Sequence, residues 1–182
     1  MPPMSFFERL AGRPRRLGFH VSERMTGTHR TLRELEPLEP VSPSLGRPIR
    51  VGSELPFSFE VRWGHPDLVH YLNPLKGDFT KALLEGTVTA GGLCTAAPLR
   101  GTLDFRYVSE ALIRYAFEFE AHGRRFRYVG EKRDLRPWNL HRTHTTCHGT
   151  IADVATGQVI SDSVVYFDLK ELPSLVGSFR LE

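Results

Sequence analysis

The chain has 182 residues, of which 40% are hydrophobic and 25% are charged, and its formal net charge is +3. This length and composition are typical of one globular domain and exclude a disordered or fibrous chain. No apolar run approaches the roughly 18 residues that a membrane helix needs, so we expect no membrane span. The basic residues form no dense stripe interleaved with aromatic side chains, which argues against nucleic-acid binding.

The first 18 residues are expected to form an N-terminal arm with a short helix over residues 5–10. Arg13, Arg15 and Arg16 lie close together in this arm and are interpreted as a solvated cluster rather than a phosphate-binding site. The start of the chain lacks the basic residues followed by an apolar core that a secretory signal would show. We therefore expect a cytoplasmic protein.

Residues 19–182 are predicted to form a single β-domain, because short segments with period-two alternation are separated by turn residues. The predicted strands cover residues 19–28, 57–61, 84–90, 97–107, 111–121, 125–132, 145–153 and 159–168. A Pro-rich loop over 31–50 follows the first strand, and a short helix over 66–72 follows the second. An antiparallel meander of about eight strands closes most economically into a lipocalin-like (calycin-like) barrel, because closure removes exposed edges.

A hairpin over residues 115–130 gives the clearest signal for this all-β fold. Its aromatic residues alternate with polar ones, so they should line one face while Glu118 points outward. A barrel of about eight strands is just wide enough to be filled by its own side chains or to hold one small ligand, and both alternatives stay open. The candidate ligand-binding residues are Trp63, Tyr115, Phe117, Phe119, Phe126, Tyr128 and Lys132.

Lys132 continues the aromatic face and lies near a strand end. Its ammonium group would either meet the oxygen of a ligand or extend along the barrel rim to solvent, and the second is the simpler interpretation. The chain has no nucleophile elbow and no glycine fingerprint for phosphates or dinucleotides. No catalytic residue and no cofactor are therefore assigned. If the barrel buries an acid or a base, Lys132 and Glu85 are the first to examine.

The densest group of metal-capable side chains comprises His141, His144, Cys147 and His148. In a strand, Cys147 and His148 would point to opposite faces, so they could not join one zinc site. No metal site is therefore expected. Cys94 and Cys147 match no metal-ligand or redox spacing, and free buried thiols are expected, with a disulfide as the alternative.

Several short motifs occur in an order that resembles a known module. They include Ser22-Glu-Arg-Met-Thr-Gly27, Phe57-Ser-Phe-Glu-Val61, Tyr128-Val-Gly-Glu-Lys132 and Thr145-Thr146. Their order resembles an accessory β-domain of large bacterial proteins that contain flavin-dependent glucose-methanol-choline oxidoreductases of the cholesterol-oxidase type. The resemblance covers about residues 19–182, and it departs where Thr143-His144 replaces an acidic start. The flavin-binding part is missing, so the chain cannot be the oxidase.

The resemblance implies a domain that accompanies enzymes of sterol-like or lipid substrates. The leading hypothesis is binding of a hydrophobic small molecule, sterol-, lipid- or polyketide-like, as an accessory to a flavin-dependent oxidoreductase. The first alternative is a cofactor-independent isomerase or cyclase that acts on an apolar substrate inside the barrel by proximity and orientation. The second alternative is a protein-interaction module, which would present a flat exposed apolar patch larger than a few hundred Å².

Overall fold

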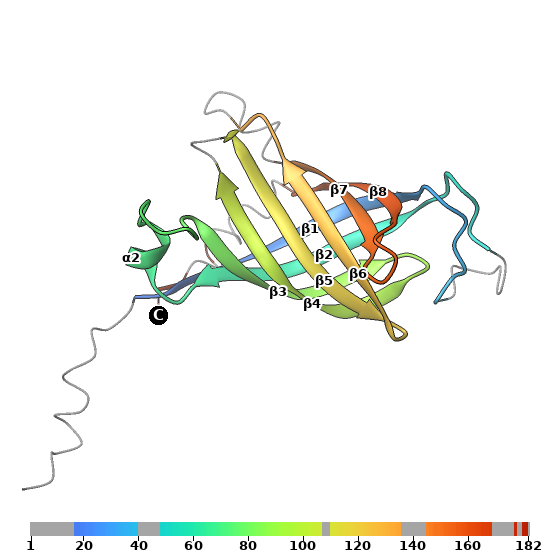
Figure 1. Ribbon diagram of the computed structural model, residues 1–182, viewed down its shortest axis with the longest axis horizontal. Helices are drawn as coiled ribbons and strands as arrows, with labels where there is room; N and C mark the ends of the chain where they lie inside the picture. Colours follow the sequence, from blue (N-terminus) through green and yellow to red (C-terminus); the bar gives the residue numbers. More distant parts are fainter. Residues whose placement is uncertain are drawn as a thin grey trace, which may run out of the picture.

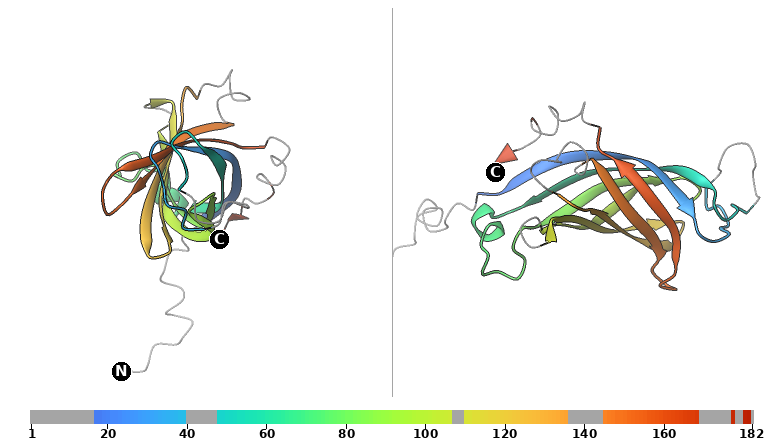
Figure 2. Two further views of the ribbon diagram at one scale, coloured as in Figure 1. Left: turned by 90° about the vertical axis from the view of Figure 1, so that its right-hand side faces the viewer. Right: turned by 90° about the horizontal axis from the view of Figure 1, so that it is seen from above.

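The computed structural model describes residues 17–39, 48–106, 110–135, 145–168, 177 and 180–181. Within this part of the chain, eight antiparallel strands close into a barrel (Figure 1). Seen end-on, the strands surround a common interior (Figure 2). The prediction of an all-β, lipocalin-like barrel is confirmed.

All eight predicted strands are present, with bounds that shift by a few residues. They are β1 (Phe19–Thr31), β2 (Glu54–His65), β3 (Lys81–Ala90), β4 (Cys94–Arg106), β5 (Leu112–Ala121), β6 (Arg124–Lys132), β7 (Thr146–Asp153) and β8 (Val159–Tyr166). The predicted helix over 66–72 is α2 (Leu68–Tyr71), and a short strand that was not expected, β9 (Arg180–Leu181), follows near the C-terminus. The strands from β2 to β8 are neighbours in chain order, as in a meander.

Strand β1 closes the barrel because it pairs on both of its edges. On one edge, β2 pairs with it along twelve consecutive residues. On the other edge, β8 pairs along Thr26–Thr31, whereas β9 pairs only with Phe19 and His20. These two partners leave the middle of β1, which carries Glu23, between them.

Alternation along the strands separates the core from the surface. In β2, Phe57 and Phe59 are buried, whereas Glu60 points outward and is exposed. The buried hydrophobic side chains of the eight strands belong to one cluster, with the exception of Leu112. Because full burial of a large apolar side chain contributes about 1.5–3 kcal/mol, this cluster is the main source of stability.

Two facing glycines make room for an aromatic ring inside the barrel. Gly130 in β6 and Gly149 in β7 are Cα partners. A Cβ atom at Gly149 would lie 2.6 Å from Cζ of Tyr128, and one at Gly130 would collide with the same ring. The Tyr128 ring therefore occupies the volume that two side chains would otherwise take.

The described parts of the predicted Pro-rich loop, residues 32–39 and 48–50, pack against one end of the barrel. Leu35 and Ile49 form an isolated β-bridge, and both are buried. The Leu38 N–H donates to the carbonyl oxygen of Gly92, in the turn between β3 and β4, at 2.8 Å. The predicted helix over residues 5–10 lies outside the described residues.

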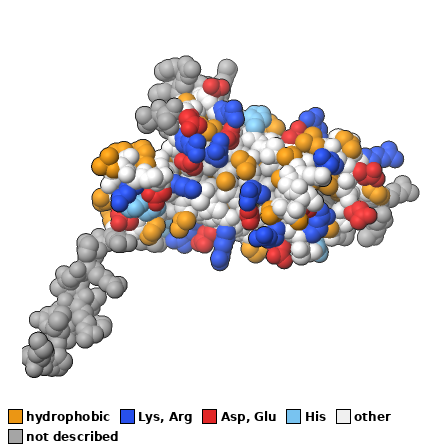
Figure 3. Space-filling model, viewed as in Figure 1, with side chains coloured by type: hydrophobic (Ala, Val, Ile, Leu, Met, Phe, Trp, Pro, Cys, Tyr) orange, Lys and Arg blue, Asp and Glu red, His pale blue; other side chains and the backbone are white. Residues whose placement is uncertain are grey.

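The outer face of the barrel carries charges of both signs. Figure 3 shows basic and acidic side chains interspersed over the visible face. Glu118, which was expected to point outward, forms an exposed ion pair with Arg127 at 2.6 Å. Among the described residues, no helix combines the length and the apolarity needed to cross a bilayer.

Candidate functional site

The β5–β6 hairpin places its aromatic residues on the inner wall, as predicted. Its register pairs Phe117 with Tyr128 and Phe119 with Phe126, so that all four face the same side. These side chains and Tyr115 are buried. Trp63, the remaining predicted aromatic residue, lies on the same inner side of β2 and is partly buried.

Aromatic rings from opposite walls meet inside the barrel. The ring centroids of Tyr128 lie 4.8 Å from Phe117 and 5.1 Å from Phe57, and Phe59 lies 5.3 Å from Phe117. These separations are those of directly packed aromatic pairs. Of the two alternatives for this part of the barrel, filling by its own side chains is the one that the structure shows.

Lys132 does not extend to solvent, so the simpler sequence-based interpretation is wrong. Its side chain is only 6% exposed, and Nζ donates to Oε1 of Glu23 at 2.8 Å. Nζ also lies 5.2 Å from the ring centroid of Tyr115 and 5.9 Å from that of Phe167. The ammonium group is thus held inside the wall by a carboxylate and two aromatic rings.

Tyr115 completes this group from β5. Its hydroxyl donates to Oε2 of Glu23 at 2.8 Å, so each carboxylate oxygen accepts one hydrogen bond from a buried donor. Burial, followed by the charge of Glu23, raises the pKa of Tyr115 well above its ordinary value. The phenol therefore keeps its proton at neutral pH. Glu23, Tyr115 and Lys132 are called the inner polar cluster below.

Cys147 lies next to this cluster and is fully buried in β7. Burial raises the pKa of its thiol to about 11, although the positive charge of Lys132 acts in the opposite direction. Its Sγ lies 3.7 Å from the hydroxyl oxygen of Tyr128. Since the thiolate is the nucleophilic form, Cys147 is not a nucleophile near pH 7. Cys94 and Cys147 are both free and buried, as expected.

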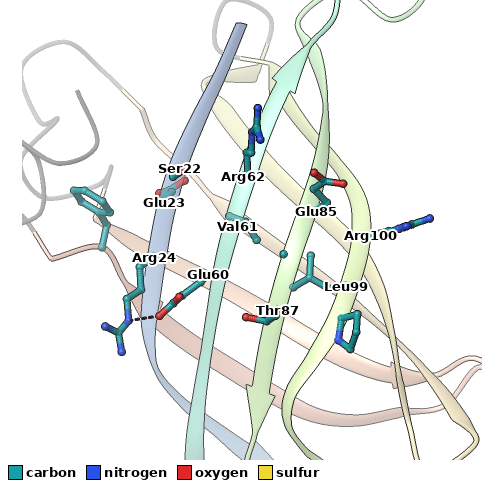
Figure 4. A pocket seen from close by; sticks show the side chains of 13 residues that line it. Ser22, Glu23, Arg24, Glu60, Val61, Arg62, Glu85, Thr87, Leu99 and Arg100 are labelled. Carbon is teal, nitrogen blue, oxygen red and sulfur yellow. Dashed lines mark ion pairs between the residues drawn. The ribbon is translucent and has the colours of Figure 1, made fainter. Parts of the chain in front are cut away.

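Glu23 is the member of the inner polar cluster that also lines a hollow on the surface. Glu23 and Phe167 line one side of a hollow of about 810 Å³ that extends over the outer faces of β1–β4 (Figure 4). Arg24 and Glu60 form an ion pair at 3.3 Å across it. The inner polar cluster therefore lies at the middle of β1, between the segments that pair with β8 and with β9.

Lys132 and Glu85, the two candidates for a buried acid or base, do not lie together in the structure. Lys132 belongs to the inner polar cluster, whereas Glu85 is exposed on the outer face of β3 and lines the hollow. Glu85 is therefore not a buried acid or base of the barrel. The inner acid is Glu23, whose position two residues after Val21 and two before Met25 places it at inward-facing parity.

The predicted orientation of the metal-capable residues in β7 is confirmed. Cys147 is buried and His148 is exposed, so the two point to opposite faces. His141 and His144 lie outside the described residues. Three other potential ligands, His65, His70 and Asp78, lie close together at the end of β2.

Chemically, the inner polar cluster presents fixed hydrogen-bond donors and a carboxylate within an apolar wall. Such a group can bind the oxygen of a ligand or take part in proton transfer. Comparisons of the chain with protein-family models, with curated proteins and with solved structures gave no match.

Proposed function

We propose that the protein binds an apolar small molecule that carries a hydroxyl or carbonyl oxygen, and that it does so in the cytoplasm. The inner polar cluster would hold the oxygen, and Phe167 would contact the apolar body beside β1. The observation that carries the proposal is the buried ion pair of Lys132 with Glu23 at 2.8 Å. Transfer of each ion from water costs several kcal/mol, and well-packed hydrophobic residues would serve stability as well.

The protonation states favour binding over reaction. Both oxygens of Glu23 already accept hydrogen bonds, and the raised pKa of Tyr115 keeps its proton in place. The neighbouring Cys147 remains a thiol because burial raises its pKa to about 11. Hydrogen-bond donors that are already held in place suit recognition of a ligand oxygen, because little ordering is needed on binding.

A fluorescence titration with three probes tests this proposal. Cholesterol, palmitic acid and 2-naphthol would be added separately while the emission of Trp63 and Trp138 is followed. We expect saturable binding of at least one probe, weakened about 10- to 100-fold in Lys132→Met, because a hydrogen bond to a charged group contributes about 1.5–3 kcal/mol.

Lys81→Met is the matched control, because Lys81 is an exposed lysine at the start of β3. This variant should bind the same probe as the unsubstituted protein does. The proposal fails if no probe binds, or if Lys132→Met and Lys81→Met bind with equal affinity. A urea melt of each variant, run in parallel, identifies loss of folding.

A cofactor-independent isomerase is the second candidate. This alternative requires an ionisable group buried among aromatic rings, and Lys132 lies 5.2 Å from the ring of Tyr115. Glu23 would take a proton from the carbon between a carbonyl and a double bond, and would return it to the far carbon of the dienolate. Tyr115 and Lys132 would hold the oxygen meanwhile.

Conversion of 3-cyclohexenone to 2-cyclohexenone, followed by ultraviolet absorbance, tests this second candidate. Turnover that is lost in Glu23→Gln and kept in Glu85→Gln supports it, since Glu85 is a carboxylate on the outer face. Equal rates with and without the protein reject it for this substrate class.

Association with a flavin-dependent oxidoreductase rests on the sequence resemblance and stays a prediction. The interaction-module alternative also stays a prediction. Co-elution of the purified chain with a glucose-methanol-choline oxidase from the same genome tests both predictions. A complex supports the association, and a complex formed by a chain that binds no small molecule favours the interaction module.

A further inference from the structure

A separate group of potential metal ligands lies at the end of β2. Nitrogen atoms of His65 and His70 and a carboxylate oxygen of Asp78 all lie within 4.8 Å of one another. The three residues come from the end of β2, from α2 and from the turn before β3. His65 pairs with Phe19, four residues from Glu23 along β1, so the group is roughly 13 Å from the inner polar cluster.

Asp67 holds the imidazole ring of His65 and the backbone of His70. Its carboxylate caps α2 by accepting the backbone N–H of His70 at 2.9 Å, and its carbonyl oxygen lies 2.7 Å from Nδ1 of His65. The backbone N–H of Asp67 donates to the same Nδ1 at 3.0 Å, so Asp67 fixes this ring through Nδ1 and Nε2 is the nitrogen left for a metal ion. The two rings then stack nearly parallel, with centroids 5.3 Å apart and an interplanar angle of 9°.

Asp78 supplies a charged oxygen to the same place. Its two carboxylate oxygens lie 2.9 and 3.0 Å from Nε2 of His70, so the carboxylate faces this imidazole directly. The backbone N–H of Lys81 donates to the carbonyl oxygen of Asp78 at 3.0 Å, which ties this turn to the start of β3.

We propose that His65, His70 and Asp78 bind a zinc ion, with water as the fourth ligand. Two imidazole nitrogens and one carboxylate oxygen match the preference of zinc, whereas magnesium and calcium favour oxygen ligands throughout. The ligand atoms would be Nε2 of His65, Nε2 of His70 and one carboxylate oxygen. In a tetrahedral zinc site the ligand atoms would be about 3.3 Å apart, and here they lie within 4.8 Å of one another.

The exposure of the group is consistent with an open fourth position. The side chains of His70 and Asp78 are 34% and 50% exposed, so water reaches both. A surface ion pair joins His70 to Asp78, and the backbone of Asp67 holds Nδ1 of His65. Metal binding uses all three and would join the end of β2 to α2 and to the turn before β3.

Cobalt(II) titration of the full chain, after treatment with a chelator, tests the proposal. Tetrahedral cobalt gives strong visible absorption bands, and we expect one equivalent to produce them, zinc to abolish them by displacement, and zinc to raise the melting temperature. In His70→Gln and in Asp78→Asn, metal affinity should fall by more than the roughly 10- to 100-fold that loss of an outer-sphere partner costs.

His148→Gln is the matched control, since it removes an exposed histidine from the outer face of β7. It should keep the cobalt bands and the zinc-induced rise in melting temperature. Melting temperatures without metal show whether His70→Gln and Asp78→Asn still fold. The proposal is overturned if the unsubstituted chain gives no cobalt bands, or if His70→Gln and Asp78→Asn give them with unchanged affinity.

Discussion

Strand β6 contributes to two ion pairs of similar length in opposite environments. Lys132 donates to Glu23 at 2.8 Å inside the barrel, and Arg127 donates to Glu118 at 2.6 Å outside it. The side chains of the inner pair are 6% and 7% exposed, and those of the outer pair 58% and 37%. The distances alone would suggest equal interactions.

The environment makes the two pairs different. Water screens the outer charges and solvates either one if its partner is lost, so such a pair contributes about 0–1 kcal/mol. Inside the barrel, loss of one partner leaves the other charge without compensation, which costs about 3–5 kcal/mol. The comparison therefore predicts that replacing one residue of the inner pair lowers the free energy of unfolding strongly, whereas replacing one residue of the outer pair hardly changes it.

The largest effect is expected from removal of one member of the inner pair. Lys132→Met or Glu23→Gln should lower the free energy of unfolding by about 3–5 kcal/mol, since each leaves a buried group unpaired. Urea melts would measure this loss. The double variant should lose less than the sum of the two single losses, because no isolated charge remains. Additive losses in the cycle would contradict direct coupling.

An intermediate effect is expected from His29, a buried histidine of β1. Its Nε2 donates to the carbonyl oxygen of Gly91 at 3.0 Å, and Nδ1 accepts from the hydroxyl of Ser161 at 3.2 Å. Burial lowers the pKa of His29 below its ordinary value of 6.5. The unfolded chain therefore binds this proton more tightly than the folded protein.

Stability should accordingly be lost as the pH falls below about 6.5, the ordinary value of a histidine. One proton corresponds to a slope of at most about 1.4 kcal/mol per pH unit. Urea melts at several pH values would show this slope, and His29→Gln should flatten it. His148→Gln, on the outer face, should leave it unchanged; equal slopes in both variants would exclude His29 as the cause.

The smallest effect is expected from the outer pair. Glu118→Gln should change the free energy of unfolding by less than about 1 kcal/mol, because water replaces the lost contact with Arg127. The remaining difference should shrink further in high salt, since salt screens exposed charges. A loss in urea melts as large as that of Glu23→Gln would remove the distinction between the two environments.

The sequence predicted the fold and the inner wall well because both depend on period-two alternation. Tyr115, Phe117 and Tyr128 follow that pattern, and they are buried as expected. The partner of Lys132 was not predicted, because Glu23 lies 109 residues away and alternation specifies a face rather than a contact. The inward parity of Glu23 was nevertheless visible in the sequence.

Alternation also explains the position of Glu85, but it does not explain the group of proposed metal ligands. Glu85 lies between inward-facing Leu84 and the glycine at 86, so its outward direction follows from the same parity argument. The group of His65, His70 and Asp78 is different, because a turn and a single helical turn bring its members together. Spacing along the chain does not encode that geometry.

Because Gly130 and Gly149 make room for the ring of Tyr128, the residues at these three positions are expected to change together among related sequences. A larger residue at either glycine would collide with the ring, so it is expected to occur only with a smaller residue at position 128. Conversely, a small residue at position 128 with both glycines retained would leave a ring-sized void between β6 and β7. Relatives of this barrel could therefore gain an internal chamber by exchange of one aromatic side chain, without any change in the number of strands.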